Sequence, residues 1–142
     1  MQMFLEFVKH NLKDDDEIYI PGYTWFGHNR STLCNIAVRG SGGVGVLIRN
    51  ELLNEYNVIV LDRSFEGIIW LKLGAKNDNS YYINLCVAYL TPERSSRGNL
   101  AQEFYDMLLS QVYTYFDENP MLIMGDLNGR IGDKQDFNEL ID

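Results

Sequence analysis

The hydrophobic positions of the chain follow two spacings, and each spacing predicts a different kind of element. From residue 40 to residue 90 the apolar residues form short runs rich in β-branched and aromatic types, and most breaks carry Gly, Asn or Asp. This pattern is typical of strands, which we expect at residues 42–48, 58–61, 68–73 and 81–89. Runs such as 58–61, which contain no polar residue, indicate strands covered on both faces.

Helical spacing predicts two helices. Near the start of the chain, apolar residues recur close to the helical period, and a run of charged residues at 13–17 closes the segment; the apolar positions are Phe4, Leu5, Phe7, Val8 and Leu12. A longer helix is expected over 99–116, where Leu100, Phe104 and Leu108 fall on one stripe and would cover a sheet face. Between the two, the aromatic stretch 23–26 follows a Pro-Gly turn and favours a further strand.

A last strand is expected at residues 121–124, where four apolar residues precede Gly125, Asp126, Leu127 and Asn128. In sheets built from alternating strands and helices, functional sites form at the carboxyl ends of the strands. We find no internal repeat and no linker of low complexity. The pattern therefore predicts the α/β fold class and one domain over residues 1–142.

The overall charge limits the possible partners. The formal net charge is −8 at pH 7, and nucleic-acid binding through the general field of a protein needs clustered Lys and Arg. Any contact with DNA must therefore be local and metal-assisted. No apolar run approaches the ~20 residues that span a bilayer, and two cysteines, Cys34 and Cys86, are too few for a disulfide framework. We expect an intracellular protein of the cytoplasm or nucleus, with no membrane partner and no bond between the two cysteines.

Asp126 and Asn128 form a candidate chemical pattern. They place a carboxylate and an amide two residues apart, just after an apolar strand. The carboxylate can accept a proton from an attacking water or help to hold a hard cation, and the amide can donate to a developing oxyanion. The alternative is an ordinary turn, because Gly, Asp and Asn are common turn residues and Asp can hydrogen-bond its own backbone.

Tyr89 is a further candidate, because it ends the predicted strand 81–89 beside a Pro turn. A phenol in that position can hydrogen-bond a phosphate; the alternative is a buried tyrosine with a satisfied hydroxyl. The two histidines have no partners at metal-ligand spacing. We therefore interpret His10 as a residue on the surface of the first helix and His28 as a loop residue.

A rival motif lies between Gly40 and Gly45, where the glycines match the pattern G-x-G-x-x-G. Asp62 ends a strand-like run downstream, near the spacing expected of a dinucleotide-binding site. That site needs a helix to start inside the glycine run, so that its N-terminus faces the pyrophosphate. Residues 44–48 favour a strand instead, so a dinucleotide-binding module is kept as the alternative.

Three motifs, in order and at matching separations, resemble the endonuclease/exonuclease/phosphatase superfamily. Residues 42–48 are similar to its glycine-led central strand, 82–92 to its strand ending in a Tyr-x-x-Pro turn, and 123–128 to its G-D-x-N motif. The segments 20–26 and 129–133 resemble the endonuclease domains of non-LTR, LINE-type retrotransposons. The likeness spans nearly the whole chain.

The resemblance implies a DNase I-like fold, which is a four-layer α/β sandwich of two packed mixed sheets with outer helices. It implies Mg²⁺-dependent cleavage of phosphodiester bonds in DNA, with Tyr89 contacting the scissile phosphate, Asp126 orienting or deprotonating the attacking water, and Asn128 stabilising the phosphate in the transition state. Members of the family also carry an early Asn, a metal-binding Glu and a late Asp-His pair, for which we find no counterparts here. We therefore expect an incomplete domain with weak metal binding and little activity, or a non-catalytic remnant that only binds partners.

Overall fold

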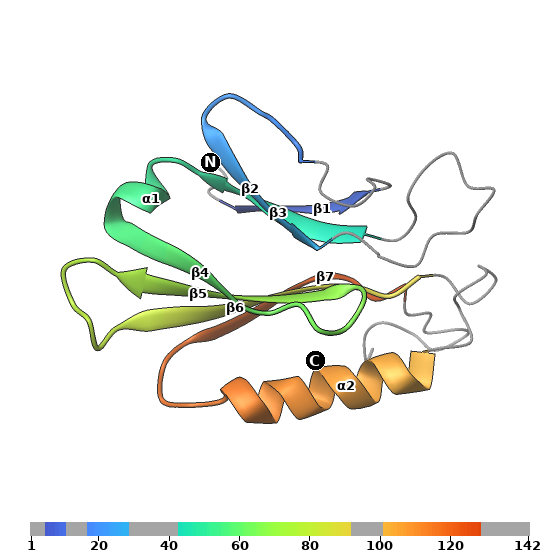
Figure 1. Ribbon diagram of the computed structural model, residues 1–142. Helices are drawn as coiled ribbons and strands as arrows, with labels where there is room; N and C mark the ends of the chain where they lie inside the picture. Colours follow the sequence, from blue (N-terminus) through green and yellow to red (C-terminus); the bar gives the residue numbers. More distant parts are fainter. Residues whose placement is uncertain (1–4, 11–16, 29–42, 92–100, 129–142) are drawn as a thin grey trace, which may run out of the picture.

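A computed structural model describes residues 5–10, 17–28, 43–91 and 101–128, and their strands form two sheets (Figure 1). Sheet A is antiparallel, in the order β1 (Leu5–His10), β3 (Gly43–Arg49), β2 (Tyr23–His28). Sheet B has the order β4 (Tyr56–Asp62), β5 (Ile68–Ala75), β6 (Tyr82–Tyr89), β7 (Met121–Asp126). The first three strands of sheet B are antiparallel, and β7 is parallel to β6. The helices are the single turn α1 (Leu52–Glu55) and the long α2 (Ala101–Tyr115).

The two sheets pack face to face, and α2 lies on the outer face of sheet B (Figure 1). The prediction of two packed sheets with an outer helix is confirmed, as are a strand over 42–48, which begins at Gly43, and a helix within 99–116. Both sheets were expected to be mixed, but only sheet B is, because the described strands of sheet A are all antiparallel. Among the described residues, no helix covers the outer face of sheet A. The described part of the fold therefore has three layers, where the DNase I-like prediction has four.

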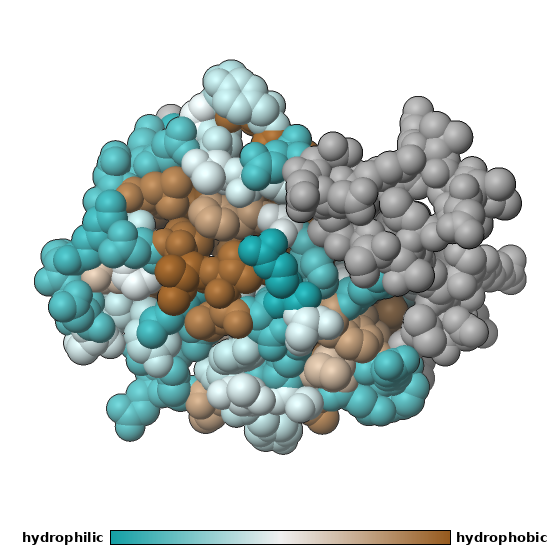
Figure 2. Space-filling model, viewed as in Figure 1, coloured by the Kyte–Doolittle hydropathy of each residue, from teal (hydrophilic) through white to brown (hydrophobic). Residues whose placement is uncertain are grey.

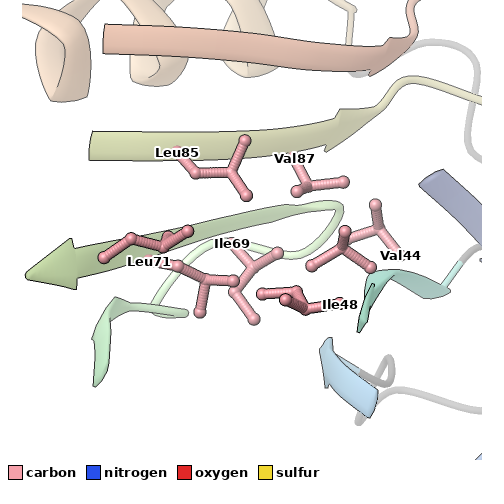
Figure 3. Close-up of a cluster of buried hydrophobic side chains, with 8 residues drawn as sticks. Val44, Ile48, Ile69, Leu71, Leu85 and Val87 are labelled. Atoms are coloured by element: carbon pink, nitrogen blue, oxygen red, sulfur yellow. The ribbon is translucent and has the colours of Figure 1, made fainter. Parts of the chain in front are cut away.

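The space between the sheets is filled by apolar side chains from β3, β5 and β6. Figure 3 shows Val44 and Ile48 pointing toward side chains of the two central strands of sheet B, which are Ile69, Leu71, Leu85 and Val87. All of these side chains are fully buried, and each contributes roughly 1.5–3 kcal/mol relative to an exposed position. The run of apolar residues in β3 is explained by its place at the centre of sheet A.

A second core lies between sheet B and α2, where Phe104 and Leu108 are buried as their stripe predicted. At its centre, the indole Nε1–H of Trp70 donates a 3.0 Å hydrogen bond to the Gln111 side-chain oxygen. The Tyr115 ring packs on the same indole, with ring centroids 5.0 Å apart. A buried amide on the helix is therefore satisfied by the one polar atom of the indole.

The predicted helix near the start of the chain is wrong, because residues 5–10 form strand β1 along β3. Leu5 and Phe7 pack against the core between the sheets, while Glu6 between them is exposed. Apolar residues at positions 4, 5, 7, 8 and 12 fit a helix and a strand equally well in this short segment. Pairing with the edge of β3 decides between them, so His10 lies in a strand and not on a helix.

Among the described residues, sheet A has one strand fewer than sheet B, and no described strand of sheet A lies above β4. The contacts between the sheets join β1 to β7, β3 to β5 and β6, and β2 to β5. Apolar side chains gather on this side, between α1 and the strands of sheet B (Figure 2). They include the partly buried Leu52, Leu53, Tyr56, Val58 and Val60. The single turn of α1 thus covers part of the core that a fourth strand of sheet A would cover.

One glycine of the rival motif, Gly45, has a structural explanation in sheet A. Gly27 and Gly45 are paired on neighbouring strands, and a Cβ atom on either glycine would collide with the Trp25 ring. The indole therefore lies flat across the two glycines, a close approach that no residue with a side chain permits. Gly45 is required by the packing of Trp25.

Candidate functional site

Tyr89 and Asp126 are direct neighbours at the carboxyl ends of two parallel strands. Tyr89 at the end of β6 pairs with Asp126 at the end of β7, so the two side chains leave the same face of sheet B. Tyr89 and Met124, two residues before Asp126, both pack against the core between the sheets. The phenol and the carboxylate therefore lie on the side of sheet B that faces sheet A, where the sandwich ends.

Backbone hydrogen bonds fix this end of the sheet. The Tyr89 amide donates to the Gly67 carbonyl oxygen at 2.8 Å, and the Leu90 amide donates to the Asp126 carbonyl oxygen at 2.9 Å. Gly125 has φ +146°, and a Cβ there would collide with the Ala88 carbonyl oxygen. The glycine of the G-D-x-N pattern thus allows β7 to approach β6 closely, just before the carboxylate.

Asn128 is hydrogen-bonded to Asp126 and to Leu90, the residue after Tyr89. Its backbone amide donates to Asp126 Oδ1 at 2.9 Å, and its side-chain amide donates to the Leu90 carbonyl oxygen at 2.6 Å. Its φ of +46° lies in the left-handed region, which Asn tolerates better than most residues. The turn expected from Gly, Asp and Asn is therefore present, and it is the same turn that holds the carboxylate and the amide together.

The structure brings all three predicted site residues to one end of sheet B. The Asn128 side chain is exposed, and Tyr89 and Asp126 are half-buried. Only one of the two N–H groups of a side-chain amide is needed for the bond to Leu90. The cluster can therefore present an anionic acceptor, an amide donor and a phenol to one small ligand.

His28 lies at the same end of the sandwich, in the last position of β2 and not in a loop as expected. Its Nδ1 is 3.1 Å from the Ile68 carbonyl oxygen, so Nδ1 is the nitrogen that carries a proton. Ile68 pairs with Ala88, next to Tyr89. Sequence reasoning missed this position because β2 and β5 belong to different sheets and no local spacing relates them.

The dinucleotide alternative loses its two requirements. Gly43 begins strand β3, which pairs on both sides, so no helix N-terminus faces a pyrophosphate there; residues 40–42 lie outside the described part of the chain. Asp62 accepts hydrogen bonds on Oδ1 from the amide and hydroxyl of Ser64 and on Oδ2 from the Tyr115 hydroxyl. Both carboxylate oxygens are therefore engaged within the protein.

The same contacts set the charge of Asp62. Partial burial raises the pKa of Asp62, but the hydrogen bonds from Ser64 and Tyr115 and the nearby His28 together lower it by more. The pKa therefore lies below the ordinary value. Burial and the bond to Asp62 raise the pKa of Tyr115 to about 12. We interpret this pair as a structural link between the end of β4 and the end of α2.

The donor set for a metal ion is small. Within the described ranges, no group of three or more His, Cys, Asp or Glu side chains is placed to hold a metal ion. Mg²⁺ is often bound by one or two carboxylates together with substrate phosphate oxygens and water. Asp126 fits such a shared site as its one carboxylate, but the described residues do not build a metal cage of their own.

No described helix is long and apolar enough to cross a membrane. No known protein family matches this sequence, and no curated protein is similar to it.

Proposed function

We propose that this chain carries part of a phosphodiester-cleaving site and that its substrate is DNA, as in the retrotransposon-type endonucleases that its motifs resemble. The observation that carries the proposal is the convergence of Tyr89, Asp126 and Asn128. The first two are paired across β6 and β7, and the third is bonded to Asp126 and to the residue after Tyr89. A carboxylate, an amide and a phenol around one position suit an anionic, hydrolysable group.

Each residue has a role that its contacts permit. The Asp126 carboxylate accepts a proton from the attacking water or orients that water. The Asn128 amide, held by its 2.6 Å bond to Leu90, donates its second N–H to a phosphate oxygen as negative charge develops there. The Tyr89 hydroxyl donates to another oxygen of the same phosphate. The net charge of −8 means that DNA contact depends on this local site.

Mg²⁺ is the proposed cofactor, with Asp126 as its protein ligand and phosphate oxygens completing the shell. The ion would supply charge neutralisation at the phosphate. Since the described residues provide no group of three or more metal-binding side chains, we expect weak binding by this chain and slow cleavage or none.

The first test is nicking of supercoiled plasmid in Mg²⁺. We expect little nicking by the 142 residues, and clear nicking by a longer chain that supplies the Asn, Glu and Asp-His positions of the resembling family. In that longer chain, Asp126→Ala should lower the rate by about 10² or more. Asp106→Ala, a carboxylate change on the exposed side of α2, is the matched control. Full activity of Asp126→Ala would show that the site is misassigned.

The second test needs no activity. A thymidine dinucleotide, which carries one phosphodiester, is titrated into the 142-residue chain with and without Mg²⁺ and followed by amide NMR shifts. We expect saturable shifts at Leu90, Asp126 and Asn128, larger with Mg²⁺ and reduced by Asn128→Ala. Shifts of equal size at the far end of the sheet, near Lys76, would contradict the proposal.

A non-catalytic remnant is the second candidate, since the described residues provide no group of three or more His, Cys, Asp or Glu side chains for a metal ion. This candidate predicts that the thymidine dinucleotide binds and that even the longer chain does not cleave DNA. The two tests together therefore separate an enzyme from a binding module.

A further inference from the structure

Strand β7 is an edge strand with the composition of a central one. Sheet B ends at β7 among the described strands. Its first four residues are Met, Leu, Ile and Met, and edge strands are usually protected by charge, Pro or a bulge. The opposite edge, β4, has a break in register between Val60 and Asp62. β7 has no such protection before Asp126.

Two neighbouring residues of β7 are exposed on opposite faces of the sheet. Leu122 and Ile123 are 44% and 45% exposed. Ile123 pairs with Cys86, which packs under α2, whereas Leu122 pairs with Leu85, which packs against sheet A. Both faces of the sheet are thus apolar at this edge.

The outer backbone groups of β7 point away from β6. The carbonyl oxygens of Pro120 and Asp126 accept hydrogen bonds from β6 and the residue that follows it. Since the N–H and C=O of one strand residue point to the same side and successive residues alternate, Met121, Ile123 and Gly125 direct theirs outward. No described strand pairs with that side.

Helix α2 continues this apolar edge. Four large apolar residues recur along its flank at helical spacing, and all are exposed: Tyr105, Leu109, Tyr113 and Phe116. β6, α2 and β7 form a crossover between parallel strands, with α2 running opposite to both (Figure 1). Such crossovers are right-handed, and in that sense of winding the flank that carries Leu109 lies on the β7 side.

The charge of this region indicates which kind of partner strand it can bind. From residue 101 to residue 128 the sequence contains no Lys or Arg, and its charged residues are Glu103, Asp106, Asp117, Glu118 and Asp126. A second copy would add no cation from this region. A strand that combines apolar and basic residues would satisfy the edge, the apolar faces and the charge together.

We propose that β7 and the adjoining flank of α2 form a docking edge for an extended, basic and apolar segment of another polypeptide, which adds to sheet B as a further strand. This surface adjoins the phosphodiester site, since Gly125 directly precedes Asp126 in β7. The incoming strand pairs with the outward groups of Met121, Ile123 and Gly125, and its apolar side chains cover Ile123 and Leu109.

The test uses the 142-residue chain and two synthetic peptides of eight residues, one alternating valine with lysine and the other alternating valine with glutamate. Binding is measured by calorimetry, and the site by amide NMR shifts. We expect the lysine peptide to bind at least ten-fold more tightly and to shift Met121, Ile123 and Gly125. Raising the salt concentration should weaken it.

Two variants of one residue make the test specific. Ile123→Pro removes an outward N–H that β6 does not use, and Ile123→Lys adds a cation at the edge; each should lower the affinity at least ten-fold while the unfolding midpoint stays close to that of the parent. Ile59→Lys, at an exposed position of the other edge strand, is the control and should bind normally. Equal binding of both peptides, normal binding by Ile123→Pro, or a dimer of the free chain that Ile123→Lys dissociates would overturn the proposal.

Discussion

The side-chain amide of Asn128 donates a 2.6 Å hydrogen bond to the Leu90 carbonyl oxygen, which ties the segment after β7 to the segment after β6. The two residues are 38 positions apart in the chain. This bond holds Asn128 beside Tyr89 and Asp126, and it connects the C-terminal ends of β6 and β7.

Asn128→Ala should destabilise the fold by about 1–3 kcal/mol, because it removes the bond to Leu90 and places Ala in the left-handed region. Asn128→Gly removes the same bond without the backbone strain and should cost less. Urea unfolding of the three proteins measures both differences. If Gly is as costly as Ala, the left-handed backbone contributes nothing and the bond carries the whole effect.

Gly125→Ala should be among the most damaging small substitutions in the chain, because the added Cβ meets the Ala88 carbonyl oxygen and φ is +146°. We expect a loss of more than about 2 kcal/mol in unfolding free energy, together with loss of the β6–β7 pairing in hydrogen exchange. Gly74→Ala is the matched control, since no atom lies within 4 Å of its Cβ position. A tolerated Gly125→Ala would mean that β7 does not approach β6 as described.

Cys86 should be unreactive in the folded protein, because burial raises the pKa of its thiol to about 12 and the thiolate is the reactive form. In a Cys34→Ser variant, a thiol reagent at pH 8 should label Cys86 only as fast as the protein unfolds. Cys86 is a free thiol, and Cys34 lies outside the described residues. The unreduced, denatured parent should therefore titrate two thiols; finding none would show that the cysteines are bonded.

Tyr115→Phe should change how stability depends on alkaline pH. The folded pKa of Tyr115 is raised from 10.0 to about 12, so between these values the unfolded chain releases a proton that the folded chain keeps. The contribution of Tyr115 is thus complete below pH 10 and is lost as pH rises toward 12. The stability difference between parent and variant should shrink over that interval.

Asp62, which accepts the Tyr115 hydrogen bond, should make stability depend on pH in the acidic range. The pKa of Asp62 is lowered in the folded state, so its contribution is present above the ordinary value of 3.8 and is lost as pH falls below it. In Asp62→Asn this acid-side loss should be absent. If the pH dependence of stability is the same in both variants as in the parent, the hydrogen bond between Tyr115 and Asp62 does not form in solution.

Most of the element types, and the residues proposed for the site, could be predicted from local sequence patterns. Runs of apolar residues predicted β3 to β7, and the stripe through Phe104 and Leu108 predicted α2. The run at 58–61 was wrongly expected to be covered on both faces: it lies in the edge strand β4, where Ile59 is 55% exposed. Asp126, Asn128 and Tyr89 were found because each stands at or just after the end of a predicted strand. These features are local, and each leaves a mark within about ten residues.

How those elements pack against one another depends on contacts between residues that are far apart in the chain. Residues 5–10 became a strand because the edge of β3 was available to pair with them, and Gly45 serves the Trp25 ring because β2 lies alongside β3. His28 lies at the site because it contacts Ile68, and Asp62 Oδ2 is engaged because it accepts from the Tyr115 hydroxyl; both contacts join distant parts of the chain. Short apolar segments and single polar residues fit several environments equally well, so long-range pairing, which no local spacing encodes, makes the choice.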